Sequence, residues 1–238
     1  MRVLLTADLH YSLPQFDWVQ QAAADFDAVV LAGDLLDIAS PVPVSGQLVA
    51  VLKHLEQLSQ QTTLLVSSGN HDLTTRNENG EKTASWMDQV RRLGIPCDGA
   101  SLQIDGFFVT ICPWWDGPRA CETVAEQLAT AAPTRGDSWI WLYHAPPSDS
   151  PTSWAGRREY GDEHLRRWIE QYQPTAVFCG HIHNAPFLDR GAWDDRIGDT
   201  WVFNAGRQIG PVPCHVVLDT DERTASWRSL AGEQSRQL

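Results

Sequence analysis

Histidines and carboxylates recur in this sequence at the ends of short apolar runs, in a spacing that suits metal binding. In the segment FCGHIHNAP, residues 178–186, His181 and His183 stand one residue apart just after an apolar run. Two neutral imidazoles that leave a strand end can point at a common position and bind a divalent metal. A pair of surface histidines in a turn is the alternative interpretation. The choice depends on whether the chain supplies further ligands.

Four other apolar runs are followed by residues of the same chemistry. These residues are Asp8 and His10, then Asp34 and Asp37 in GDLLD, Asn70, His71 and Asp72 in GNHD, and His144. In open α/β sheets, functional groups collect in the loops beyond the carboxyl ends of the strands. Since all five runs carry such residues at that place, we predict that they meet in one metal site.

The elements that must position these residues follow from the hydrophobic pattern. Five short runs rich in β-branched or other apolar residues read as buried strands, at 3–5, 28–32, 63–67, 139–143 and 175–179. Between them, apolar residues spaced near 3.6 predict helices over 14–24, 45–60, 83–93 and 162–172. This alternation is typical of an α/β fold in which helices cover a largely buried sheet.

A second strand-rich region indicates a second sheet. Residues 101–115 form two alternating runs around Asp105-Gly106, a strong hairpin signal, and 200–206 and 214–221 also read as strands. We therefore expect a four-layer α/β/β/α sandwich of two mixed sheets flanked by helices. The segment from Arg223 onward is compatible with a last strand or with a frayed tail. No repeat or long linker divides the chain, so we expect a single domain over residues 1–238.

The overall charge limits the classes of partner. The chain has 238 residues, 42% of them hydrophobic, with 30 acidic against 18 basic residues and a formal net charge of -12. Such a surface repels polyanions, so duplex nucleic acid is not an expected partner. An anionic substrate must be drawn in locally, and bound divalent cations would do this. Nothing in the pattern indicates an oligomeric state.

Cysteine usage and hydropathy predict the compartment. The five cysteines include no C-x-x-C pair and are odd in number, as expected for reduced, buried thiols of a cytoplasmic protein. The apolar run at residues 3–5 is too short for a signal peptide, and no segment approaches the ~20 apolar residues of a spanning helix. We therefore expect no association with a membrane.

Taken together, the motifs DxH, GDLLD, GNHD, a lone His after an apolar strand, and GHIH resemble the calcineurin-like metallophosphoesterase superfamily, whose five motifs they match in order. The match runs from Asp8 to His183. It extends to Asn204-Ala205-Gly206, where relatives often have an Asn-Pro-Gly turn, and the change at Ala205 affects no ligand. The resemblance implies the metallophosphoesterase form of the α/β/β/α sandwich.

The resemblance also implies two divalent metal ions with seven ligands. One ion would be held by Asp8, His10 and His183, the other by Asn70, His144 and His181, and Asp34 would bridge both. The chemistry explains the bridging residue independently, because only an anionic carboxylate offers a lone pair to each of two cations with compensating charge. Mixed imidazole and oxygen ligation suits Mn, Fe, Zn or Ni and leaves open positions for water and substrate.

Two further residues receive catalytic roles from the resemblance. His71 resembles the family's histidine that stabilises charge or protonates the leaving oxygen, and Asp37 resembles the carboxylate that orients it. For Asp37, a loop or N-cap carboxylate is the alternative. The implied reaction is in-line attack on phosphorus by a metal-bridging hydroxide.

The resemblance therefore implies a metal-dependent phosphoesterase, and we expect it to act on a small-molecule phosphodiester or phosphomonoester. The alternatives are a nuclease or a phosphoprotein phosphatase with the same site, or a metal-binding scaffold without turnover. The roles of Trp114, Trp115, Arg76, Arg157 and Arg158 stay open: each lies in a loop that either reaches the substrate or covers the core and surface. We assign no functional role to His54, His164 or His215, whose positions fit a helix surface or a strand.

Overall fold

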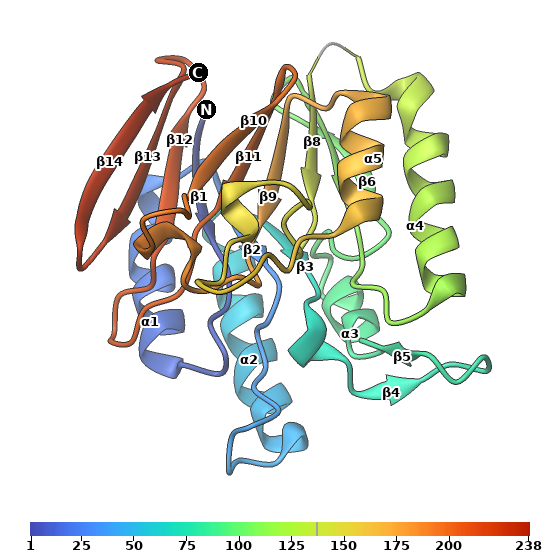
Figure 1. Cartoon of the computed structure of the whole chain (residues 1–238). Helices are drawn as coiled ribbons and strands as arrows, with labels where there is room; N and C mark the ends of the chain where they lie inside the picture. The colour runs from blue at the N-terminus through green and yellow to red at the C-terminus, as the bar shows by residue number, and fades with distance from the viewer. Residues whose placement is uncertain (137) are drawn as a thin grey trace.

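Two six-stranded sheets form the centre of the molecule in the computed structural model, which describes residues 1–136 and 138–238 (Figure 1). The first sheet has the order β14-β13-β12-β1-β2-β3. Its strands are β1 (Arg2–Thr6), β2 (Ala28–Ala32), β3 (Thr63–Ser67), β12 (His215–Asp219), β13 (Thr224–Ser229) and β14 (Gly232–Gln237). β1, β2 and β3 run parallel, whereas β12, β13 and β14 are added antiparallel, so the sheet is mixed.

The second sheet is also mixed and has the order β10-β11-β9-β8-β7-β6. Its strands are β6 (Ser101–Ile104), β7 (Phe107–Ile111), β8 (Trp139–Leu142), β9 (Ala176–Cys179), β10 (Asp194–Ile197) and β11 (Thr200–Asn204). The four inner strands are parallel, and β6 and β10 pair antiparallel at the edges. The predicted hairpin turn joins β6 to β7, with φ of 44° at Asp105 and 86° at Gly106, the left-handed conformations that a tight two-residue turn requires.

Alternation along the strands divides the apolar side chains between two layers. In β1, Leu5 packs between the sheets, where it meets residues of the second sheet such as Leu142 and Phe178, while Leu4 faces the other way. The strands are therefore buried on both faces, which explains why they read as continuous apolar runs rather than as alternating ones.

Helices cover the outer face of each sheet. α1 (Leu13–Ala22), α2 (Val44–Ser59) and α3 (Met87–Arg92) pack on the first sheet, and α4 (Pro118–Ala131) and α5 (Glu163–Tyr172) pack on the second. Figure 1 shows α4 and α5 together on one side of the molecule. The predicted four-layer α/β/β/α arrangement is confirmed. Within the described residues, no helix has the combined length and hydrophobicity needed to cross a bilayer.

One predicted helix begins later than expected, the helix α4 was not predicted, and the tail takes the strand alternative. The helix predicted over 83–93 begins only at Met87, because Lys82 and Thr83 form strand β5 (Lys82–Thr83) and pair with β4 (Thr75–Arg76) in a small hairpin. The tail after Arg223 is not frayed, since it adds β13 and β14 to the first sheet. Short 3-10 turns complete the chain at Ala23–Asp25, Asn70–Asp72, Ala132–Thr134, Pro151–Ser153 and Ala185–Phe187.

The strand register brings the motif loops together. In the first sheet the parallel pairing sets Thr6 level with Leu31 and Ala32 level with Ser67, so β1, β2 and β3 end at one edge. Backbone hydrogen bonds then join successive loops: the Asp8 amide donates to Gly33 O and the Gly180 amide donates to His144 O. The five loops that carry the predicted ligands therefore share one end of the sandwich.

Candidate metal centre

The predicted ligands fall into two clusters that share one carboxylate. Asp8, His10, Asp34 and His183 place one ligand atom each within 4.8 Å of one another, and Asp34, His144 and His181 do the same. Asn70 joins the second cluster, because its Oδ1 lies 2.8 Å from His181 Nδ1. The structure thus brings together all seven predicted ligand residues.

Asp34 occupies the position between the clusters. Its Oδ2 lies 3.5 Å from His10 Nε2 on one side and 3.3 Å from His144 Nε2 on the other. Its Oδ1 accepts a 2.8 Å hydrogen bond from the amide of His71, which fixes the plane of the carboxylate. A carboxylate held between two sets of imidazoles has the geometry expected of a residue that bridges two cations.

His144 supplies an independent test of whether the pocket fits a metal. Its side chain is fully buried, and its Nδ1 lies 2.6 Å from the carbonyl oxygen of Ala32, to which the ring donates. With Nδ1 committed to the Ala32 carbonyl, Nε2 is the ring nitrogen left for a cation, and it has no hydrogen-bond partner among the described residues. A buried ring nitrogen without a partner is costly in a protein interior, and coordination of a cation would satisfy it.

The first cluster is equally compact. His10 Nε2 lies 3.1 Å from His183 Nε2, and Asp8 Oδ1 lies 3.3 Å from the same His183 nitrogen. The Asp8 carboxylate also accepts the amide of His181 through both oxygens, at 3.1 and 3.0 Å. Two imidazole nitrogens and a carboxylate oxygen lie close together here, a mixed donor set that suits a divalent metal.

Strained backbone marks the same residues. Asp8, His10, Asp34 and His181 have φ of 56°, 43°, 54° and 67°, a left-handed conformation that non-glycine residues seldom adopt. Each such residue costs of order 1–3 kcal/mol unless the surroundings impose it. The coincidence of this strain with four of the seven predicted ligands indicates that the loops are shaped for ligand geometry rather than for local stability.

Close packing of backbone supports the ligands. A Cβ on Gly69 would lie 2.2 Å from Asp34 Oδ1 and 2.7 Å from His144 Nε2, so only glycine fits between the two loops. A Cβ on Gly180 would lie 2.6 Å from Asp8 Oδ2. These glycines permit the close approach of ligands that come from different strands.

Asp72 connects two ligand loops, a role that the sequence did not reveal. Its buried carboxylate accepts the amides of Leu35 at 3.1 Å, Leu36 at 2.9 Å and Gly69 at 2.8 Å. Leu35 follows Asp34 directly and Gly69 precedes Asn70, so one side chain positions two predicted ligands. Burial and the neighbouring charge of Asp34 raise the pKa of Asp72 to about 7.

His71 and Asp37 lie beside the clusters. His71 Nδ1 is 3.5 Å from Asp37 Oδ1, and the His71 ring contacts that of His10 edge-on at a centroid distance of 4.4 Å. Asp37 Oδ1 also accepts the amide of Ala39 at 2.9 Å, so the carboxylate closes its own turn as well as facing the imidazole. Both interpretations of Asp37 are therefore compatible with its contacts.

The electrostatics of the metal-free protein reflect the crowding of charges. Burial opposes ionisation of Asp8, but hydrogen bonds with His10 and His183 hold its pKa well below the ordinary value. Burial alone would lower the pKa of His144, but the neighbouring Asp34 carboxylate outweighs it and raises this pKa to about 9. For His181, burial and the nearby His144 act in the same direction and lower the pKa to about 4. The Asp8 and Asp34 carboxylates, whose pKa values are both lowered, are thus ionised at neutral pH and attract cations.

The remaining sequence candidates take different places. Arg76 bonds to Gly80 O within its own hairpin, and Arg158 lies over the Tyr160 ring at 4.3 Å, while Arg157 is exposed. Trp114 contacts the site itself, with its ring centroid 5.1 Å from that of His181 and 5.5 Å from that of His144.

Comparison with known proteins agrees with this geometry. The chain matches the model of the calcineurin-like phosphoesterase family over residues 1–185. Comparison with curated proteins yields no matching sequence.

Similar solved structures extend over nearly the whole chain. One is TT1561 of Thermus thermophilus, with 16% identity and a TM-score of 0.64, covering 99% of this chain and 98% of the other. Another is purple acid phosphatase PPD1 from seeds of yellow lupin (Lupinus luteus), with 16% identity and a TM-score of 0.58, covering 99% of this chain and 53% of the other. At these identities they establish a common fold. The family match over most of the chain establishes that this protein belongs to the calcineurin-like phosphoesterases.

Proposed function

We propose that the protein is a binuclear metal-dependent phosphoesterase that hydrolyses a phosphate ester of a small molecule. The observation that carries this proposal is the pair of ligand clusters joined by Asp34. One cluster comprises Asp8, His10, Asp34 and His183, and the other Asn70, His144, His181 and the same Asp34. When bound, divalent metals supply positive charge for the phosphoryl oxygens and lower the pKa of a water molecule.

The chain's own residues prepare the site for this chemistry. The Ala32 carbonyl fixes the tautomer of His144, and the amide of His71 fixes the carboxylate plane of Asp34. Because these donors and acceptors are already in place, little reorganisation is needed when cations and substrate arrive.

His71 would move or hold a proton at the ester oxygen. Its ring is about one-fifth exposed and adjoins His10. Burial lowers the pKa of His71, although the charge of Asp34 opposes this. His71 Nδ1 accepts the Ile38 amide at 3.4 Å and lies 3.5 Å from Asp37 Oδ1, so the ring would be held on this side with Nε2 left for the substrate.

Substrate class and compartment form part of the proposal. The formal net charge of -12 favours a small ester over duplex nucleic acid. All five cysteines are buried free thiols, which suits the cytoplasm, and we expect the whole chain to act as one domain.

The test is hydrolysis of bis(p-nitrophenyl) phosphate and p-nitrophenyl phosphate by metal-stripped protein that is resupplied separately with Mn, Ni, Zn or Mg. Transition-metal-dependent turnover is expected, and preference for the diester would identify a phosphodiesterase. Metal binding without turnover of either ester, or of nucleotide esters, would favour the scaffold alternative. Failure to bind metal would contradict the proposal.

A further inference from the structure

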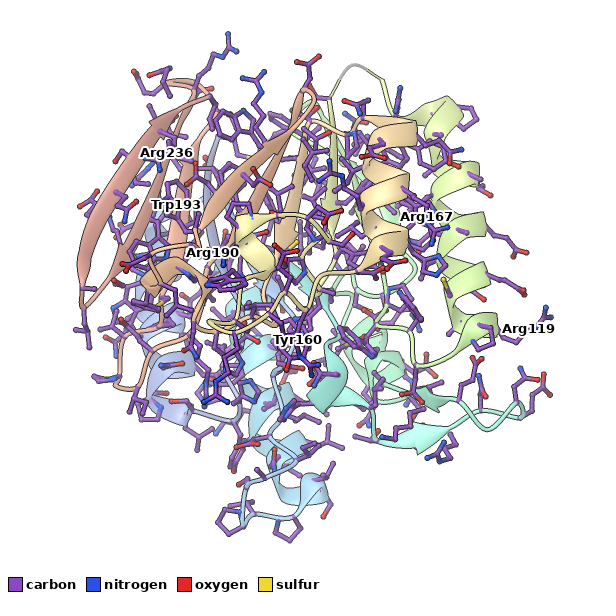
Figure 2. All side chains as sticks on the ribbon, in the orientation of Figure 1. Arg119, Tyr160, Arg167, Arg190, Trp193 and Arg236 are labelled. Atoms are coloured by element: carbon purple, nitrogen blue, oxygen red, sulfur yellow. The ribbon has the colours of Figure 1, made fainter. Side chains whose placement is uncertain are left out.

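An aromatic pocket adjoins the second ligand cluster. It has a volume of about 560 Å³ and includes His144 and His181 in its wall. Four aromatic side chains also line it: Trp114, Trp115, Tyr143 and Tyr160. Tyr160, labelled in Figure 2, comes from the loop between β8 and α5 and is about half exposed at the rim. This size and lining are typical of a small-molecule site.

Trp114 links the pocket to the metal centre. Its ring lies against those of His181 and His144, and its backbone amide donates to Ser68 Oγ at 3.0 Å, directly after β3. A phosphoryl group held at the second cluster would therefore project one of its ester substituents along Trp114 and into the pocket.

Trp115 is held in place by a chain of hydrogen bonds. Its Nε1 donates to the hydroxyl of Tyr143, which donates in turn to Asp162 Oδ2. The other oxygen of Asp162 accepts the amides of His164 and Leu165 and so caps α5. The indole ring is thus fixed before any ligand arrives, and a fixed aromatic face binds a planar group at a low entropic cost.

The charge of the lining selects the kind of planar group. Asp116, Asp162 and Glu163 line the pocket beside His164, and its described lining residues include no lysine or arginine. Both oxygens of Asp162 already accept hydrogen bonds and Asp116 Oδ2 accepts the amide of Lys82, which leaves Glu163 and the second oxygen of Asp116 as acceptors for a ligand. Carboxylates disfavour a second phosphate at this place and accept hydrogen bonds from ring or exocyclic N–H groups. A neutral heteroaromatic ring with N–H donors fits both the aromatic faces and the acidic edge.

A second hollow does not offer the same chemistry. It has a volume of about 400 Å³, lies between the β4–β5 hairpin and α4, and shares Trp114 with the aromatic pocket. Its described lining mixes Lys82, Arg91 and Arg119 with several carboxylates and includes none of the predicted metal ligands.

We propose that the aromatic pocket binds the base of a nucleoside, so that the substrate is a phosphate ester of a nucleoside. This inference rests on the proposed phosphoesterase function. It assigns Trp114 and Trp115 as the residues that determine specificity, through stacking on the base, and it assigns the acidic edge to recognition of the amino groups of the base.

The experiment compares phosphate monoesters that carry a base, a sugar without a base, or a plain aromatic ring. Adenosine 5′-monophosphate, ribose 5-phosphate and phenyl phosphate are used as competitors of p-nitrophenyl ester hydrolysis by the metal-loaded protein. We expect adenosine monophosphate to compete about tenfold more tightly than ribose 5-phosphate, as one stacked base contributes. Equal competition by the first two would overturn the pocket assignment, and phenyl phosphate competing as tightly as adenosine monophosphate would overturn the assignment to a base.

Variants locate the effect. In Trp115→Ala, the inhibition constants of adenosine monophosphate and ribose 5-phosphate should differ by no more than about twofold, while the inhibition constant of ribose 5-phosphate stays unchanged. Trp18→Ala is the matched control, because Trp18 is half-buried on α1 beside His215, outside the pocket lining, and should keep the full advantage. Loss of the advantage in both variants would overturn the assignment.

A binding measurement separates this inference from the proposed function. Adenosine monophosphate should quench tryptophan fluorescence in the metal-loaded protein, and less so in Trp115→Ala. Base-dependent quenching without hydrolysis of any ester would support the pocket and refute the phosphoesterase. Ester hydrolysis that adenosine monophosphate and ribose 5-phosphate inhibit equally would refute the pocket assignment and still support the phosphoesterase function.

Discussion

Replacing Asp72 with alanine removes the side chain that joins the loops of Asp34 and Asn70. Three buried amides, those of Leu35, Leu36 and Gly69, lose their acceptor. An unsatisfied buried donor costs about 1–3 kcal/mol, so the three together correspond to about 3–9 kcal/mol. Water entering the space left by the carboxylate would satisfy some of them, and we therefore expect the lower end, about 3 kcal/mol. That loss is a large fraction of the about 5–15 kcal/mol of a typical domain.

Urea unfolding of the metal-free protein measures this loss, and titration with Mn measures its effect on the site. Asp88→Ala is the control, since Asp88 is an exposed carboxylate on α3 and should change stability by less than about 0.5 kcal/mol. Asp72→Ala should also bind metal more weakly, because its loss frees the backbone next to two ligands. An Asp72→Ala protein as stable as Asp88→Ala, with unchanged metal affinity, would refute the assigned role of the carboxylate.

Three further predictions concern the site and its surroundings. Gly69→Ala should abolish tight metal binding, because the added Cβ would overlap Asp34 and His144. The control Gly46→Ala in α2, where the added Cβ would lie 3.3 Å from its nearest neighbour, should bind metal as the wild type does. Calorimetric titration with Mn measures both affinities, and equal affinity of the two variants for Mn would show that the loops can move apart. Burial raises the pKa of Asp98 from 3.8 to about 6, so its contribution to folding stability is present below pH 3.8 and is lost as the pH rises through 6. Denaturant unfolding should show that the free energy of unfolding of the wild type, relative to Asp98→Asn, falls by up to about 3 kcal/mol between pH 4 and pH 7. A difference in unfolding free energy that stays constant over this pH range would contradict the prediction. His71→Ala should keep both metals and lose about 10²–10⁴-fold in kcat, and loss of metal from this variant would place His71 among the ligands.

The gathering of the motif loops was predictable from sequence because it depends on local pattern. Each motif follows a short apolar run, and parallel strands deliver such groups to one edge of a sheet, so residue type and position placed Asp34, His144 and the others together, whereas their roles as metal ligands follow from the family resemblance. The layers of the fold were predictable for a similar reason. Strands buried on both faces and helices with a 3.6-residue period leave distinct patterns.

The supporting contacts were not predictable, because they depend on tertiary structure. Asp72 accepts the amide of Leu35, which lies 37 residues away along the chain. Because every residue except proline has a backbone amide, the sequence does not show which amide a carboxylate will bind. Likewise, the chain from Trp115 through Tyr143 to Asp162 joins residues from three segments. α4 was missed although Cys121, Val124 and Leu128 form its buried face, since its alanines and polar residues weaken the apolar contrast.

The number of metal ions bound per chain tests the central claim most directly. Metal-stripped protein is loaded with Mn or Zn, freed of excess metal, and measured by elemental analysis together with protein concentration. The two clusters sharing Asp34 predict two ions per chain in the wild type, and Asp34→Asn should retain fewer than one, since each cluster loses its common anionic ligand. A single ion in the wild type, or two ions retained by Asp34→Asn, would contradict the binuclear site.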